Sequence, residues 1–199
     1  MGVFVWQITE TRADLAAGFQ WQSTDRTEFA SINHPLKQAE WLASRRLLQW
    51  VCASKNLDYA HIIKDHHGKP YLINSHVGVS ITHTSAYAAV AINTSGSVGI
   101  DLETMRPKLW RVSERFLNTS EAQLVGNDIE KLCYVWCAKE AVYKCCGQRQ
   151  VSFKEHISIN FSEHLPQSAA RARIKTPTFE VHYELHHRFF DNHCLAVAF

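Results

Sequence analysis

The chain has 199 residues, of which 46% are hydrophobic and 20% charged, and its formal net charge is +2. A globular chain of this length forms one large domain or two small, closely packed ones. The small net charge, without dense Lys/Arg runs, argues against nucleic-acid binding, and no stretch reaches the ~18 apolar residues that span a membrane.

The N-terminus and the cysteines indicate an intracellular protein. Met1–Gln7 has no basic flank and is typical of a first strand, not of a secretory signal, so we expect a cytoplasmic location. A disulfide between the adjacent Cys145 and Cys146 would be strained, and we expect the six cysteines to be reduced thiols. Zinc is a weak hypothesis, because there is no CxxC pair and because His182 and His186 lie in a predicted strand, where they do not converge.

The first half of the chain is predicted to contain one long helix and several short strands. Apolar residues recur at helical spacing over Leu36–Ser54 and predict a helix there. Short apolar runs bounded by turn residues predict strands at Val3–Ile8, Tyr71–Ile73, Val77–Thr82 and Tyr87–Ile92.

The second half repeats this layout. We expect a strand at Val98–Glu103 and a long helix over Glu130–Cys146 that ends at Gly147. Ser120 is a candidate cap for a shorter helix. The fold class is therefore α+β, with an N-terminal half (1–97) and a C-terminal half (98–199). The other predicted elements are helical segments near Trp110–Phe116 and Ser120–Val125, and strands near Ser152–Phe161, Phe179–Leu185 and Cys194–Phe199, with polar linkers between these strands.

Two carboxylates lie on one face of the Val98–Glu103 strand. Asp101 and Glu103 are two residues apart, so their side chains project together while Ile100 and Leu102 turn into the core. Carboxylates in this arrangement repel each other unless a positive charge lies between them. Mg²⁺ suits the site, because it usually binds one or two carboxylates together with waters and phosphate oxygens. The competing interpretation is a solvated pair at the end of a strand.

A second motif lies on the Glu130–Cys146 helix. Trp136, Glu140 and Lys144 are four residues apart and share one stripe of the helix. Taken alone, Glu140 and Lys144 would be interpreted as a surface ion pair worth a few tenths of a kcal/mol. Together with the two upstream carboxylates, they indicate a magnesium and phosphate site.

Four motifs occur in an order that resembles the 4′-phosphopantetheinyl transferases, which convert apo carrier proteins to their holo form. Gly99–Glu103 (GIDLE) and Trp136–Lys144 (WCAKEAVYK) match the family's strand and helix. Ser80–Thr84 (SITHT) is similar to the family's N-I-S-H-S segment, and Gly68–Pro70 matches its G-K-P. The resemblance implies a pseudo-twofold pair of halves with the active site between them, in a fused form expected to act as a monomer.

The reaction implied by this resemblance is attack of a carrier-protein serine on the β-phosphorus of coenzyme A, with release of adenosine 3′,5′-bisphosphate. The resemblance implies that Asp101, Glu103 and Glu140 bind Mg²⁺, and that Glu140, or a metal-bound water that it orients, takes the serine proton as general base. It assigns Lys144 and Lys139 to the diphosphate. The expected catalytic residues are Asp101, Glu140 and Lys144.

The resemblance also implies contacts to coenzyme A and to an acyl or peptidyl carrier protein. Lys69, Thr82 and His83 are expected to bind coenzyme A, with Thr82 in place of the family's serine. Arg45, followed by Lys37, is the candidate for the 3′-phosphate. Carriers of this class are commonly acidic, so basic residues of the second half are candidates for steering them: Arg111, Arg115 and Lys131.

Two other functions remain open. One is a non-catalytic module of the same fold that binds coenzyme A or another nucleotide. The presence of all three carboxylates and of Lys144 argues against it. The other is a metal-dependent phosphohydrolase that uses the same acidic cluster.

Overall fold

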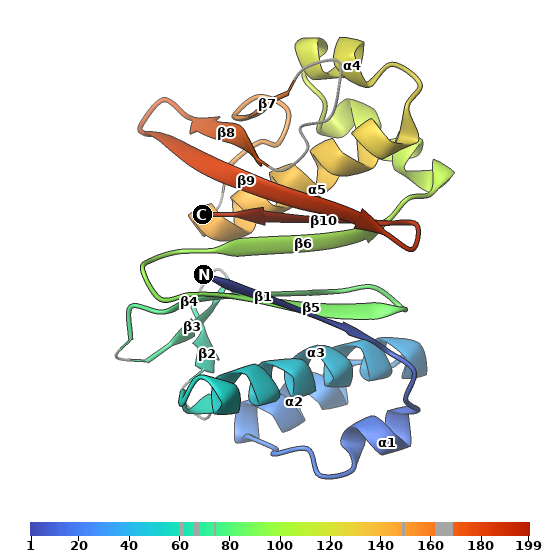
Figure 1. Cartoon of the computed structure of the whole chain (residues 1–199), viewed down its shortest axis with the longest axis vertical. Coiled ribbons are helices and arrows are strands. Elements are labelled where there is room, and N and C mark those ends of the chain that lie inside the picture. The colour runs from blue at the N-terminus through green and yellow to red at the C-terminus, as the bar shows by residue number, and fades with distance from the viewer. Residues whose placement is uncertain (60–61, 66–67, 74, 149, 162–168) are drawn as a thin grey trace.

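Two antiparallel five-stranded sheets form the centre of the computed structural model, and each carries a long helix (Figure 1). The structure describes residues 1–59, 62–65, 68–73, 75–148, 150–161 and 169–199. The strand orders are β1-β5-β4-β3-β2 and β6-β10-β9-β8-β7. The predicted α+β class is confirmed. Within the described part of the chain, no helix is both long enough and apolar enough to cross a membrane.

The first sheet is covered by α3 (Pro35–Ser54). This helix starts with a proline at a position where no amide donor is needed, and the His34 side chain accepts a hydrogen bond from the Leu36 amide at 3.2 Å. Leu42, Leu48 and Val51 on α3 are fully buried in the core beneath the sheet. The other elements of this half are β1 (Gly2–Gln7), α1 (Arg12–Ala16), α2 (Ser23–Ser31), β2 (Ile62–Lys64), β3 (Pro70–Leu72), β4 (Gly78–His83) and β5 (Tyr87–Asn93).

The second sheet packs against α5 (Ile129–Cys146). Asp128 caps the N-terminus of this helix. Gly147 ends it in the left-handed conformation at φ 70°, and this is the end that the sequence predicts. The other elements are β6 (Gly99–Thr104), the 3₁₀ helix η2 (Pro107–Arg115), α4 (Thr119–Val125), β7 (Ile157–Asn160), β8 (Ala169–Lys175), β9 (Glu180–Phe190) and β10 (His193–Ala198).

The two sheets meet where β4 faces β6. Ser80 Oγ accepts a hydrogen bond from the Ile100 amide at 3.0 Å, and Thr82 Oγ1 accepts one from the Leu102 amide at 3.3 Å. These hydroxyls supply acceptors to amides on the edge of the second sheet, which would otherwise be buried without a partner. Beside them, Ala89 and Val197 belong to an apolar cluster shared by both sheets. The motif strands of the two halves are therefore held side by side.

Several predicted elements differ from those observed. The predicted strand Ser152–Phe161 is a turn followed by the short β7, and the α4 cap is Asn118, not Ser120. Strand β8 was expected to be a polar linker. It alternates Arg171 and Arg173 with small or apolar residues that face the core, so its apolar signal is weak.

Candidate functional site

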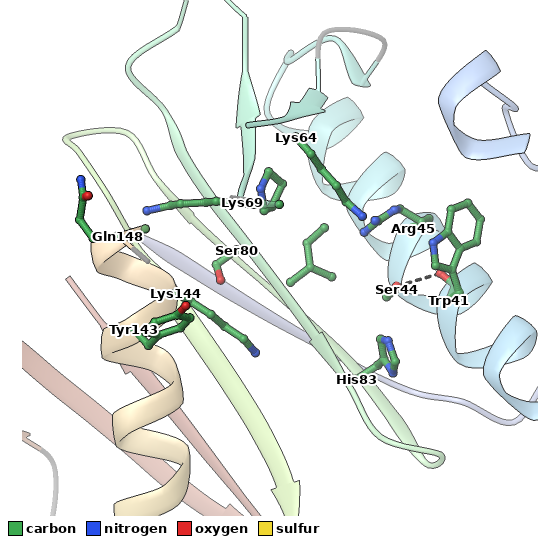
Figure 2. A pocket seen from close by; sticks show the side chains of 14 residues that line it. Trp41, Ser44, Arg45, Lys64, Lys69, Ser80, His83, Tyr143, Lys144 and Gln148 are labelled. Atoms are coloured by element: carbon green, nitrogen blue, oxygen red, sulfur yellow. Dashed lines mark hydrogen bonds between the residues drawn. The ribbon is translucent and has the colours of Figure 1, made fainter. Parts of the chain in front are cut away.

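A cavity of about 340 Å³ opens between the two halves (Figure 2). Helix α3, strand β4 and the C-terminal end of α5 form its walls, so residues far apart in the sequence face the same space. The charged side chains that line it are cationic or imidazole groups, and no described carboxylate lines it. These side chains are Arg45, Lys64, Lys69, His83 and Lys144. Such a lining favours a ligand with several negative charges.

Lys144 lies at the border between this cavity and the predicted acidic cluster. Its Nζ donates to Asp101 Oδ1 at 2.6 Å and to the Ile100 carbonyl at 3.1 Å. Burial opposes the charge of this ammonium, but the contact with Asp101 outweighs burial and raises the pKa of Lys144 above its ordinary value. Lys144 therefore carries its positive charge at neutral pH, within reach of an anion in the cavity.

The Lys144 contact depends on a close approach of β6 to α5. A Cβ atom placed on Gly99 would lie 1.9 Å from the Ala141 carbonyl oxygen and 2.5 Å from the Cys145 amide nitrogen. Both neighbours are backbone atoms and cannot move aside separately, so only glycine fits this position. The glycine of the GIDLE motif thus lets α5 place Lys144 beside Asp101.

The other two carboxylates of the predicted metal site, Glu103 and Glu140, are near enough to Asp101 to interact with its charge. Glu103 accepts a hydrogen bond from Arg106 Nη2 at 3.1 Å, and burial raises its pKa. No described residue donates a hydrogen bond to the Glu140 carboxylate. Burial, followed by the charges of Asp101 and Glu103, raises the pKa of Glu140 to about 7. The three carboxylates are thus close enough to repel one another.

The expected metal site is not formed as a closed cluster. Among the described residues, no group of three or more His, Cys, Asp or Glu side chains is arranged to hold a metal ion. Lys144 and Arg106 each draw one carboxylate into an ion pair, to Asp101 and to Glu103. The donor types nevertheless fit a hard divalent cation, because carboxylate oxygens are its preferred ligands and a cation would relieve their repulsion.

The raised pKa of Glu140 makes protein stability depend on pH. Between pH values near the ordinary carboxyl pKa of 4.5 and about 7, folded Glu140 keeps a proton that the unfolded chain has released. The free energy of unfolding must therefore fall as pH rises through this window. In metal-free buffer at pH 8, we expect Glu140→Gln to be more stable than the wild type by about 3 kcal/mol, and at pH 4.5 nearly equal to it. Urea denaturation at both pH values measures this, and equal stability at pH 8 would contradict it.

Lys139 lies elsewhere than predicted. Its side chain is fully buried, and its Nζ donates to the Phe116 and Phe153 carbonyl oxygens at 2.6 and 2.8 Å. It also forms an ion pair of 2.6 Å with the buried Glu121. Lys139 does not line the basic cavity, and its ammonium is already bound by the loops of its own half, so this position does not suit contact with a diphosphate.

Thr82 is buried behind the cavity wall and does not line it. Its hydroxyl lies 3.3 Å from Asp101 Oδ1 while it accepts the Leu102 amide. Its neighbours Ser80 and His83 do line the cavity. Thr82 thus positions the carboxylate of Asp101. To contact a ligand directly, the Thr82 hydroxyl would have to break its hydrogen bonds to Asp101 and to the Leu102 amide.

His83 and Lys69 both line the cavity, as a ligand-binding role requires. His83 Nδ1 lies 3.1 Å from Glu40 Oε2, which also binds the ammonium of Lys37 at 2.6 Å. Burial lowers the pKa of His83, so its ring is neutral at physiological pH. Lys69 Nζ donates to the Cys145 carbonyl at 2.5 Å across the junction between the halves, and burial lowers its pKa.

Arg45 lines the cavity beside Lys64, which sequence reasoning did not identify. The guanidinium of Arg45 lies 5.2 Å from the centroid of the Trp41 ring and forms an ion pair with Glu28 at 3.1 Å. Lys64 pairs with the same carboxylate. Neither Lys64 nor Glu28 belongs to a recognisable motif. Lys64 lies on a short strand and Glu28 on a helix whose apolar residues have almost no helical periodicity, so neither element was predicted.

A second cavity, of about 610 Å³, lies beside the acidic cluster. Glu103 and Glu140 lie at its edge, and its apolar walls include Leu109, Phe116, Trp136 and Phe153. Its rim is basic, with Arg106, Lys108 and Arg115. Arg111 and Lys131, also predicted to steer a carrier, do not line it, and Arg111 is exposed.

Comparison with known proteins agrees with this arrangement. The profile of the 4′-phosphopantetheinyl transferase superfamily matches residues 97–198, and that of the 4′-phosphopantetheinyl transferase N-terminal domain matches residues 27–93. A protein of Synechocystis sp. named as a candidate 4′-phosphopantetheinyl transferase is 32% identical over 156 residues, which are 72% of this chain and 59% of that protein. This chain therefore spans about three fifths of that relative's length.

A more distant relative is the 4′-phosphopantetheinyl transferase AcpT of Escherichia coli. It is 24% identical over 147 residues, which are 70% of this chain and 72% of AcpT, in both strain O157:H7 and strain K12. The two family profiles meet near residue 97, between the two sheets, and together they cover both walls of the basic cavity. The chain belongs to the 4′-phosphopantetheinyl transferase superfamily.

Proposed function

We propose that this protein transfers the 4′-phosphopantetheine arm of coenzyme A to a serine of an apo acyl or peptidyl carrier protein. The observation that carries the proposal is the position of Lys144, which joins the basic cavity to Asp101 of the acidic cluster. Transfer from a diphosphate to a hydroxyl requires a basic site that binds the diphosphate and, next to it, a cluster of carboxylates that can bind a metal ion.

Coenzyme A is the ligand that we assign to the basic cavity. Lys144 and Lys69 would hold the diphosphate from the α5 side, and Arg45 with Lys64 would hold the 3′-phosphate from the α3 side. His83 lies between the two groups, and its Nδ1 faces the Glu40 carboxylate at 3.1 Å, so its Nε2 would donate to a phosphate oxygen only after the ring gains a second proton, which the phosphate charge favours. Each cation is already oriented by a carbonyl, carboxylate or aromatic partner, so binding costs little side-chain entropy.

Mg²⁺ is the cation that we assign to Asp101, Glu103 and Glu140, and when bound it would neutralise charge on the diphosphate. Glu140 is suited to act as the general base that takes the serine proton, because its pKa of about 7 lies near physiological pH. Lys144 would stabilise the negative charge that develops on the phosphate of the leaving nucleotide.

The second cavity is the site that we assign to the carrier protein. Glu140 lines this cavity, whereas Lys144, one helical turn further on, lines the basic cavity, so a serine entering there would meet the proposed base next to the proposed diphosphate site. Its apolar walls suit a helix face, and its basic rim suits an acidic carrier.

The basic rim predicts a salt-dependent reaction. Raising NaCl from 50 to 300 mM should lower the second-order rate constant for the carrier by roughly tenfold, because steering by exposed charges is screened. Arg115→Gln should lower the rate at low salt and flatten the dependence, whereas Lys154→Gln, exposed and outside the rim, should not. Stopped-flow measurements with a fluorescent coenzyme A would show this, and an equal rate at both salt concentrations would refute steering.

Mass spectrometry of apo carrier proteins incubated with this protein, coenzyme A and Mg²⁺ tests the proposed function. We expect the carrier to gain the mass of one phosphopantetheine arm, and adenosine 3′,5′-bisphosphate to accumulate in equal amount. Free phosphopantetheine in the absence of carrier would indicate the phosphohydrolase instead. Bound coenzyme A with no product of either kind would indicate a binding module.

A further inference from the structure

One carboxylate, that of Glu28 on α2, accepts from three donors at the α3 end of the basic cavity. Glu28 Oε2 accepts from Trp41 Nε1 at 3.0 Å and from Arg45 Nη2 at 3.1 Å, and Oε1 pairs with the ammonium of Lys64. All three donor residues line the basic cavity. Glu28 stands behind them and lines a neighbouring cavity of about 600 Å³ instead.

Glu28 holds two cavity cations in place. Arg45 is only 12% exposed, and its guanidinium is fixed by Glu28 and by the face of the Trp41 ring. Lys64 is 43% exposed and comes from the short strand β2, so the same carboxylate draws it towards Arg45. Figure 2 shows the nitrogen atoms of Lys64 and Arg45 directed towards each other beside Trp41.

The charge of Glu28 also limits what these two cations can attract. Arg45 and Lys64 carry two positive charges, and Glu28 cancels one of them. A ligand anion that enters the cavity must therefore share both cations with a carboxylate that is already bound. A phosphomonoester carries nearly two negative charges and three acceptor oxygens, so it can compete. A hydroxyl at the same place has no charge with which to compete.

We infer that Glu28 tunes the affinity of the cavity for the terminal phosphomonoester of the bound nucleotide, because its carboxylate competes with that phosphate for Arg45 and Lys64. This inference rests on the proposed function, because it takes the nucleotide part of coenzyme A as the ligand. In the empty cavity, Glu28 keeps the two cations oriented. When the nucleotide is bound, Glu28 lowers the affinity of these cations for the 3′-phosphate. The nucleotide product, which carries the same 3′-phosphate, is thereby released more readily.

Glu28→Gln separates the two effects, because it keeps the shape and the acceptor for Trp41 but removes the charge. Isothermal titration should give a Kd for adenosine 3′,5′-bisphosphate that is roughly 5- to 10-fold lower in Glu28→Gln than in the wild type. The Kd for adenosine 5′-monophosphate should change less than about twofold. Glu155→Gln removes one exposed carboxylate outside both cavities and should leave both Kd values unchanged.

Two further variants locate the effect. The gain should vanish in Glu28→Gln combined with Arg45→Gln, and Lys64→Gln alone should weaken bisphosphate binding selectively. An unchanged or higher Kd for the bisphosphate in Glu28→Gln, or equal tightening for both nucleotides, would overturn the inference. If the wild-type protein binds the bisphosphate but never modifies a carrier, the proposed function is overturned. The comparison of wild type with Glu28→Gln then remains valid. Binding of neither nucleotide would overturn both.

Discussion

Glu140→Gln should lower the transfer rate at saturating coenzyme A and carrier by about 1000-fold, while coenzyme A still binds. Glutamine has nearly the same shape but cannot accept the serine proton, and loss of a general base costs about 100- to 10,000-fold. Lys144, Lys69 and Arg45, which we propose to hold coenzyme A, line the other cavity and are unchanged in this variant. Single-turnover transfer and isothermal titration with coenzyme A measure the two effects separately.

The matched control is Glu130→Gln, an exposed carboxylate on the first turn of the same helix. It should keep wild-type rates. The wild-type rate should also fall with decreasing pH as Glu140 gains its proton, with a midpoint below the metal-free pKa of about 7, because a bound Mg²⁺ would lower that pKa. Wild-type turnover in Glu140→Gln would remove this residue from the mechanism.

Lys139→Met should have the largest effect on stability, lowering the free energy of unfolding by about 3–5 kcal/mol. The change leaves the buried carboxylate of Glu121 without its counter-ion and two carbonyl oxygens without their donor. Glu121 also accepts from the Ile159 and Asn118 amides, so β7 and the start of α4 depend on the same group. Urea denaturation monitored by circular dichroism measures the loss.

Lys131→Met is the control for this variant, because it removes a lysine from the same helix without a described ion pair and should cost less than about 1 kcal/mol. The structure places Lys139 away from the basic cavity, so a folded fraction of Lys139→Met should bind coenzyme A with a Kd within about threefold of wild type. If Lys139→Met has normal stability but binds coenzyme A much more weakly, the structural position of Lys139 is contradicted. That result would support the contact between Lys139 and the diphosphate that the motif implies.

The sequence predicts well the elements whose pattern is local. Helix α5 combines apolar periodicity, an Asp128 cap and a Gly147 stop, and it is found within a residue of its predicted start and at its predicted end. Helix α2 is missed because its side chains show almost no amphipathic pattern, and its packing through Phe29 depends on Trp21 and Trp41 from other segments. Such contacts exist only after folding and leave no periodic signal in the chain.

Motif spacing predicts which residues share a face of a helix or strand. It does not show whether that face is turned to the core or to a cavity, or which groups its side chains contact. Lys139 and Glu140 are neighbours in the WCAKEAVYK motif, yet the helix turns one into the core and the other to the edge of a cavity. Likewise, Thr82 binds Asp101 and the backbone of β6, a role that depends on the two sheets meeting. Glu28 has no motif at all, because its role comes from two cations on separate elements.

We propose that Asp101, Glu103 and Glu140 bind one divalent cation beside the ligand in the basic cavity. Isothermal titration of Mg²⁺ at pH 8 into protein saturated with coenzyme A tests it, with Glu103→Gln/Glu140→Gln as the comparison. We predict one Mg²⁺ per chain in the wild type and no measurable binding in the double variant. Binding of Mg²⁺ with the same stoichiometry and affinity in the double variant would place the ion elsewhere and contradict the claim.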